Sequence, residues 1–183
     1  ALQQDPKNAA DDNGFEADND ANGTTNTPVS EPTIYNATLC GKKQPVDGPK
    51  QQYAALVRRS SKGSINNLVA TGFEACVDIR EAATAVEVKS SICFDIGYAT
   101  PANNIAYAEE VGGAGVLADD DAGLDERAWF KTAASKNAET DPKITDCFAA
   151  KPDFTPTATL TTNAATPPDD GFFDTTASYI GAF

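Results

Sequence analysis

The chain has 183 residues, enough for one domain with a single core, and its 27 acidic and 14 basic side chains give a formal net charge of −13. This charge repels phosphate backbones and anionic lipid headgroups, and no apolar run approaches the roughly 18 residues of a membrane-spanning helix, so we expect neither nucleic acid as a partner nor membrane insertion. Histidine is absent, which argues against histidine-ligated zinc, haem and histidine-dependent catalytic triads, and we expect no nucleotide cofactor either.

The first segment, residues 1–31, carries seven acidic side chains against one lysine and has few apolar residues, which predicts an acidic, loop-rich segment. Within it, Asp18, Asp20 and Asn22 have the spacing found at the start of a calcium loop, where oxygen ligands alternate. Val29 stands at the twelfth position, where a complete EF-hand has glutamate. Two interpretations stay open: a structural Ca²⁺ site with these three ligands, or a flexible acidic loop.

In residues 32–98, short apolar runs with β-branched residues are separated by Gly, Asn and Ser, which is typical of strands and tight turns. These runs repeat along the chain. Residues 34–41 align with 65–72 and more loosely with 88–94, while a second strand type at 55–59 aligns with 77–81. One turn of the pattern takes about 22 residues, a period that belongs to solenoids, and the extra length before Tyr53 is interpreted as a protruding loop.

Each repeat is too small to bury its own apolar face, so we expect the repeats to stack as the parallel rungs of an all-β solenoid. Period-two alternation places Asn36 on the same face as Ile34, and Asn67 on the same face as Ile65. This pattern predicts an inward asparagine ladder at a turn, with surface turn formers as the alternative.

The four cysteines lack any CxxC spacing, which leaves disulfides or buried thiols as their roles. Four cysteines allow three full pairings. We favour a bridge between Cys76 and Cys93, because both fall in neighbouring segments of the repeat. The candidates for disulfide formation are Cys40, Cys76, Cys93 and Cys147.

The rest of the chain is expected to consist of a loop and helix insertion at 99–150, with one short α-helix at 124–134, and an extended closing segment at 151–183. The end of that segment is aromatic and apolar. We expect it to dock on a partner surface or to cap an open end of the core. The residues expected to mediate docking or assembly are Phe172, Phe173, Tyr179, Ile180 and Phe183.

Two sets of side chains have the residue types of carbohydrate chemistry. The acidic run 119–121, with Asp125 and Glu126, could supply an acid/base pair of the glycosidase kind. Asp78 and Arg80, near two arginines of the preceding rung, have the types that a calcium-dependent uronate lyase needs. A solvated loop and the water-facing side of a half-buried strand explain these patterns more simply, so we assign no catalytic residue.

The run from Pro32 to Phe94 resembles the β-helical region of large secreted bacterial surface proteins with pectate-lyase-like solenoids, and residues 141–144, 152–156 and 171–183 resemble their C-terminal closing segment. The resemblance covers most of residues 15–183. It implies a right-handed parallel β-helix and further chain beyond this segment, but no particular activity, because the fold supports many.

These observations favour an extracellular or cell-surface module with a structural or adhesive role. The start at Ala1 and the absence of methionine fit an exported product. Uncapped rung ends would promote self-association into a filament or surface layer, or contacts with other surface proteins. The alternative is a carbohydrate-binding or calcium-dependent polysaccharide lyase-like module. Its candidate glycan contacts are Tyr35, Tyr53, Tyr98 and Trp129.

Overall fold

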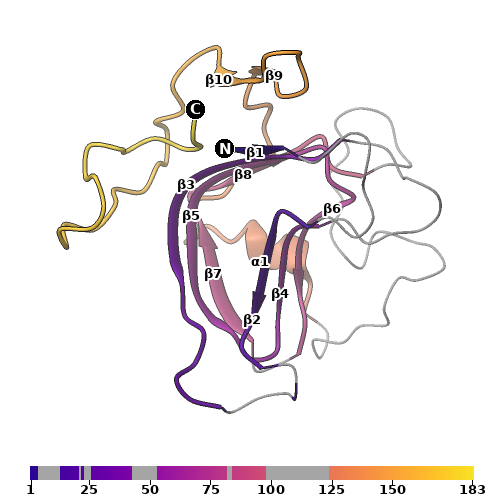
Figure 1. Cartoon of the computed structure of the whole chain (residues 1–183), viewed down its shortest axis with the longest axis vertical. Coiled ribbons are helices and arrows are strands. Elements are labelled where there is room, and N and C mark those ends of the chain that lie inside the picture. The colour runs from indigo at the N-terminus through magenta and orange to yellow at the C-terminus, as the bar shows by residue number, and fades with distance from the viewer. Residues whose placement is uncertain (4–12, 21, 23–25, 43–52, 82–83, 98–123) are drawn as a thin grey trace.

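The computed structural model describes residues 1–3, 13–20, 22, 26–42, 53–81, 84–97 and 124–183. Strands dominate these residues, and the helix among them is short, which confirms the all-β expectation (Figure 1). In chain order the elements are β1 (Leu2–Gln3), β2 (Phe15–Asp18), β3 (Thr33–Cys40), β4 (Tyr53–Arg58), β5 (Lys62–Thr71), β6 (Ala75–Ile79), β7 (Ala85–Lys89), β8 (Ile92–Phe94), α1 (Glu126–Phe130), β9 (Ile144–Asp146) and β10 (Asp153–Pro156).

The chain alternates between two parallel sheets. The first sheet has the order β1-β3-β5-β7, with β8 also pairing with β5, and the second has the order β2-β4-β6. Ile65 pairs with Val88 in the first sheet, and Ala55 pairs with Val77 in the second, so the predicted repeat of about 22 residues is confirmed. The strands β1 and β2 lie in the segment that the sequence predicts to be loop-rich, and they extend both sheets at the N-terminal end.

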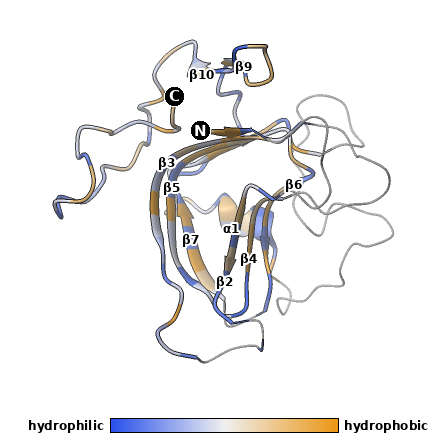
Figure 2. Cartoon of the chain, in the orientation of Figure 1, coloured by the Kyte–Doolittle hydropathy of each residue, from blue (hydrophilic) through white to orange (hydrophobic). Residues whose placement is uncertain are grey.

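The two sheets share one core. Alternate residues of β4 and β6, such as Val57 and Val77, pack against Ile65, Leu68 and other apolar residues of the first sheet. Figure 2 shows hydrophobic stretches along the strands of both sheets. Each rung therefore buries its apolar face against its own opposite strand and against the rungs on either side.

One corner of the stack is built from residues with left-handed backbone. Asn36, Asn67, Ser90 and Lys136 have φ values of 54°, 57°, 52° and 57°. Register pairs flank these positions on successive rungs, so the four residues form one column. A left-handed residue breaks the period-two alternation, so both Ile65 and Leu68 face the core although Asn66 and Asn67 separate them.

The predicted inward asparagine ladder is therefore wrong. Asn36 Nδ2 donates to the carbonyl oxygen of Ala177 at 3.1 Å, and Asn67 Nδ2 donates to that of Ala165 at 2.8 Å. Both asparagines stand at the same corner of neighbouring rungs, as predicted, but their amides bind the C-terminal segment outside the stack.

Another corner brings two glycines together. Gly41 and Gly72 follow the register pair Cys40 and Thr71, and Gly41 N donates to Thr71 O at 2.7 Å. A Cβ atom on Gly72 would lie 2.1 Å from the carbonyl oxygen of Gly41, and Gly72 has a φ of +76°. Only glycine fits this position without a shift of the neighbouring backbone.

Helix α1 covers the last strand of the second sheet. Phe130 is fully buried in the core, and Glu126 accepts a hydrogen bond from the backbone N–H of Ile79 in β6, at 3.4 Å. Asp125 caps the helix by accepting from Ala128 N at 2.8 Å. The helix is shorter than the predicted 124–134. The side chains of Ser135 and Asn137 both bond to the Phe130 carbonyl, which satisfies the C-terminal end of the helix.

The C-terminal segment, residues 140–183, lies outside the stack and carries the antiparallel pair β9 and β10. We call its last part, residues 157–183, the tail. Ile180 of the tail is buried against Val69 and Ile92 on the outer side of the first sheet. The disulfide Cys40–Cys147 ties this segment to β3, and the predicted disulfide Cys76–Cys93 is confirmed. Among the described residues, no helix is long and apolar enough to cross a bilayer.

Candidate functional site

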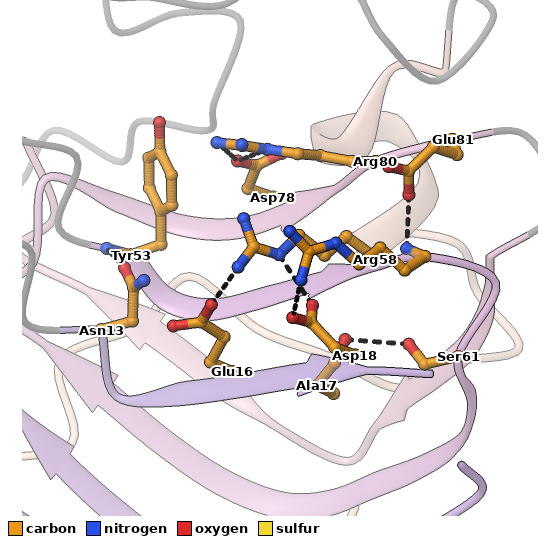
Figure 3. Close-up of polar contacts among 11 residues, drawn as sticks. Asn13, Glu16, Ala17, Asp18, Tyr53, Arg58, Ser61, Asp78, Arg80 and Glu81 are labelled. Carbon is orange, nitrogen blue, oxygen red and sulfur yellow. Dashed lines mark hydrogen bonds and ion pairs between the residues drawn. The ribbon is translucent and has the colours of Figure 1, made fainter. Parts of the chain in front are cut away.

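The outer face of the second sheet carries a cluster of charged side chains, which we call the charged face (Figure 3). Strand alternation sends Ala17, Val57 and Ile79 into the core and turns their polar neighbours outward. Because the strands are parallel and in register, the outward side chains of three rungs come close together. The charged face consists of Glu16, Asp18, Arg58, Arg59, Asp78, Arg80 and Glu81.

Most of these charges pair within the face. Arg58 Nε lies 2.7 Å from Asp18 Oδ1, and a second nitrogen of Arg58 binds Glu16. Arg59 Nη1 lies 2.6 Å from the other oxygen of Asp18. On the next rung, Arg80 contacts Asp78 through Nε at 2.9 Å and Nη2 at 2.8 Å. Ion pairs therefore link β4 and the residue after it to β2, whereas the Arg80–Asp78 pair lies within the rung of β6. Glu81 joins this rung to the preceding one by accepting a hydrogen bond from Arg59 N.

Tyr53 stands at the edge of the charged face. The Arg80 guanidinium lies 5.8 Å from the centre of the Tyr53 ring. The backbone N–H of Tyr53 donates to Asn13 Oδ1 at 2.9 Å. Burial, and then the charge of Asp78, raise the pKa of the Tyr53 hydroxyl above its usual value. Tyr53 is one of the predicted glycan contacts, and in the structure it is only 4% exposed and packs against Leu56 and Ala75.

Asp18→Asn is expected to lower the free energy of unfolding by about 1–2 kcal/mol, because one carboxylate faces two guanidinium groups and is only 27% exposed. Urea denaturation measures this loss. Glu87→Gln is the matched control, since the pair of Glu87 and Lys89 is 61% and 43% exposed and contributes about 0.5 kcal/mol or less. Equal losses in both variants would contradict a structural role for the charged face.

The charged face is poorly suited to proton abstraction. The hydrogen bond from Arg58 to Asp18 raises the pKa of the Arg58 guanidinium, which keeps this group protonated and therefore unable to accept a proton. Arg80 is paired with Asp78, two residues before it in the chain. Asp125 and Glu126, two of the carboxylates considered for acid/base chemistry, have structural contacts instead. Asp125 caps helix α1, and Glu126 accepts a hydrogen bond from Ile79 N of β6. The run 119–121 lies outside the described residues.

The candidate calcium ligands bind different partners within the protein. Asp18 points to the two arginines of the charged face. Asp20 Oδ1 accepts from Asn22 N at 2.8 Å, and its other oxygen accepts from the Asn26 amide. The part of the chain with described coordinates contains no group of three or more potential metal ligands. The Ca²⁺ site stays a prediction.

A polar groove lies on the outer side of the first sheet, where β3, β5 and β7 run beside the tail. Its volume is about 340 Å³. It is lined from the sheet by Tyr35, Ser64, Asn66, Glu87, Lys89 and Ser90, from the turn after α1 by Ala134, Ser135 and Lys136, and from the tail by Ala164 and Ala165. A second hollow of about 480 Å³ shares Ser64 and Glu87 with it. Tyr35, a predicted glycan contact, thus lines a groove that also holds a carboxylate.

The other predicted aromatic contacts are spread over the molecule. Trp129 packs against the core from α1, and Tyr98 lies outside the described residues. In the tail, Ile180 is buried, Tyr179 packs on Phe183 with ring centres 5.1 Å apart, and Phe183 is 48% exposed. These contacts lie within the chain, and docking on a partner stays a prediction for these residues.

One aromatic contact beside the groove was not predictable from the sequence. The rings of Tyr35 and Phe173 meet edge to face at 5.1 Å, and Phe172 contacts Phe173 at 5.0 Å. Phe172 is 84% exposed. Tyr35 is far from both phenylalanines in the chain, so only the course of the tail brings the rings together, and no repeat or spacing could have revealed this contact.

Comparison with known proteins agrees with this architecture. Residues 3–139 match the family described as pectate-lyase-like beta helix domain. No curated protein and no solved structure matches the chain. Apart from Leu2 at the start of β1, the matched range contains both parallel sheets and helix α1, and it ends where the C-terminal segment begins. The match spans well over half of the sequence and confirms the resemblance found from the repeats, so the chain belongs to the pectate-lyase-like beta helix domain family.

Proposed function

We propose that this chain is an extracellular structural and adhesive module built on a right-handed parallel β-helix. The observation that carries this proposal is the charged face, whose arginines are held by carboxylates. Ion pairs join the rungs of β2 and β4, and Arg80 pairs with Asp78 within the rung of β6. Because these side chains are paired with one another, they stabilise the stack and are not available to bind a substrate. The two disulfides support an extracellular location, because such bonds persist in oxidising compartments.

Self-association is part of this proposal. The two ends of the stack differ in whether their outermost described strands are covered by other parts of the chain. At one end α1 covers the edge of β6 and the 131–139 turn pairs with β8. At the other end β1 and β2 are the outermost described strands of their sheets. Parallel edge strands are the usual site for pairing with another chain. We therefore expect contacts between copies to use the β1 and β2 end.

An assay for unsaturated uronate release from polygalacturonate, with Ca²⁺ present, tests the non-catalytic part of the proposal. We expect no product, because the basic groups of the charged face are held by carboxylates. The Arg80→Ala variant is the control for contaminating activity. Product formed by the wild-type chain and lost in Arg80→Ala would replace the structural role by the lyase-like alternative.

Light scattering over a range of concentrations tests self-association. The expected result is a mean mass that rises with concentration. Leu2→Lys is expected to abolish the rise, because Leu2 is 43% exposed on the outermost described strand of its sheet and a charge at an edge strand opposes strand pairing. A particle of constant monomeric mass at high concentration would contradict assembly through the β1 and β2 end.

A second candidate function is carbohydrate binding without cleavage. The specific observation in its favour is the groove in which Tyr35 and Glu87 lie together with hydroxyl and amide side chains. Sugars are bound by such combinations of an aromatic ring and hydrogen-bonding groups. This function is compatible with an adhesive module, because a bound glycan would be the attachment point.

A further inference from the structure

We propose that the groove beside Tyr35 binds a neutral oligosaccharide and that the tail forms one wall of this site. The inference rests on the carbohydrate-binding candidate above and adds to it the ligand class and the role of the tail. It concerns the outer side of the first sheet, on the other side of the core from the charged face.

The floor of the groove offers fixed hydrogen-bonding groups. Ser64 and Asn66 of β5 face it, and Asn66 Nδ2 is held by Ser64 Oγ at 3.1 Å. Ser90 and Ser135 line its far end, where Ser90 N donates to Ser135 O at 2.8 Å. Hydroxyl and amide groups both donate and accept, which suits the hydroxyls of a sugar. These groups lie on strands and on the turn after α1, so their positions are already fixed. Little conformational entropy is therefore lost on binding.

The tail wall is fixed in place by a reciprocal pair of hydrogen bonds. Asn67 Nδ2 donates to Ala165 O at 2.8 Å, and Ala165 N donates to Asn67 Oδ1 at 2.8 Å. Ala164 and Ala165 line the groove directly. The side chain of Asn67 is itself fully buried, so the position of this wall is set by a residue that no ligand touches.

An aromatic lip extends the groove. Tyr35 lines the groove and contacts Phe173 at 5.1 Å with an interplanar angle of 62°, and Phe172 continues the row at 5.0 Å and 86°. The C–H faces of pyranose rings pack on aromatic rings, whose faces carry partial negative charge. The 84% exposure of Phe172 leaves most of its ring open for such a contact.

Charge favours a neutral ligand over an acidic one. Glu87 is paired with Lys89 at 2.6 Å, and Lys136 is the other charged residue that lines the groove. One additional positive charge is small beside the net charge of −13, which repels polyanions approaching the molecule. A groove of about 340 Å³ holds a ligand of a few sugar units at most.

The test is a glycan array with the full chain, followed by calorimetry on a neutral oligosaccharide that binds. We expect neutral oligosaccharides to bind and polygalacturonate fragments to stay unbound at physiological salt. Phe173→Ala and Asn67→Ala are each expected to weaken binding at least tenfold. Phe148→Ala is the matched control, because Phe148 is 39% exposed and lies outside the groove, and its affinity is expected to be unchanged.

Thermal melting of each variant shows whether it is folded. Phe172→Ala provides a second test, since this ring is 84% exposed and its removal costs only its contact with Phe173. Binding of uronate fragments alone would overturn the neutral class. Full affinity in folded Phe173→Ala and Phe172→Ala would overturn the role of the tail. If no glycan binds, this inference fails, whereas the structural role is judged separately by the uronate and light-scattering assays.

Discussion

Replacing Cys40 and Cys147 together by serine is expected to lower the free energy of unfolding by about 4–5 kcal/mol and to release the C-terminal segment from the first sheet. The disulfide joins residues that are 107 positions apart, and cross-links that close long loops restrict the unfolded chain most. In the folded state it holds the start of the C-terminal segment against β3, so the bonds of the tail to Asn36 and Asn67 lose their nearest anchor.

Urea denaturation measures the loss, and limited proteolysis measures the release, through new cleavage within residues 148–183. The comparison is the Cys76→Ser, Cys93→Ser variant. This bridge spans 17 positions, so its removal is expected to lower the free energy of unfolding by about 3 kcal/mol and to leave the tail protected. A tail that resists proteolysis equally in both variants would show that its own contacts suffice to hold it.

Gly72→Ala is expected to lower the free energy of unfolding by about 3–5 kcal/mol. The new methyl group would lie 2.1 Å from the carbonyl oxygen of Gly41, so the backbones of two adjacent rungs must move apart. The φ of +76° adds strain for any residue with a side chain. The affected corner joins β3 to β5, which carry much of the core. Calorimetry or urea denaturation gives the change.

Gly171→Ala separates the two causes. Gly171 has a φ of +80°, close to that of Gly72, but a Cβ atom there would meet nothing within 4 Å. Its substitution is expected to lower the free energy of unfolding by only about 1 kcal/mol, from backbone strain alone. Similar losses at both glycines would mean that the close approach of Gly41 and Gly72 contributes little.

The parts of the fold that repeat were predictable from the sequence. Stacking places equivalent residues side by side, so aligning 34–41 with 65–72 gave the register of β3 and β5 directly, and the neighbouring rungs of Cys76 and Cys93 gave their disulfide. The strands β1 and β2 escaped prediction because they are short, and because their apolar positions stand within an acidic segment.

The parts that depend on a single dihedral or on a distant segment were not predictable. The direction of the Asn36 and Asn67 side chains follows from their positive φ, which period-two reasoning does not include. The tail binds largely through its backbone, as at Ala165, and backbone groups leave no mark on the sequence. The residue types of the charged face are recognisable in part from the sequence, but the pairing of Arg58 and Arg59 with Asp18 depends on the register of β2 and β4.

The path of the tail affects how cooperatively the molecule unfolds. In a stack where each rung touches only its neighbours, the end rungs can fray one at a time, and partly open forms accumulate. Here the tail contacts β3 through Thr38, β5 through Asn67 and β8 through Ile92, so it acts as a brace across the rungs. Opening any one of them also breaks contacts that steady the others. Such bracing favours a single cooperative transition over gradual unravelling.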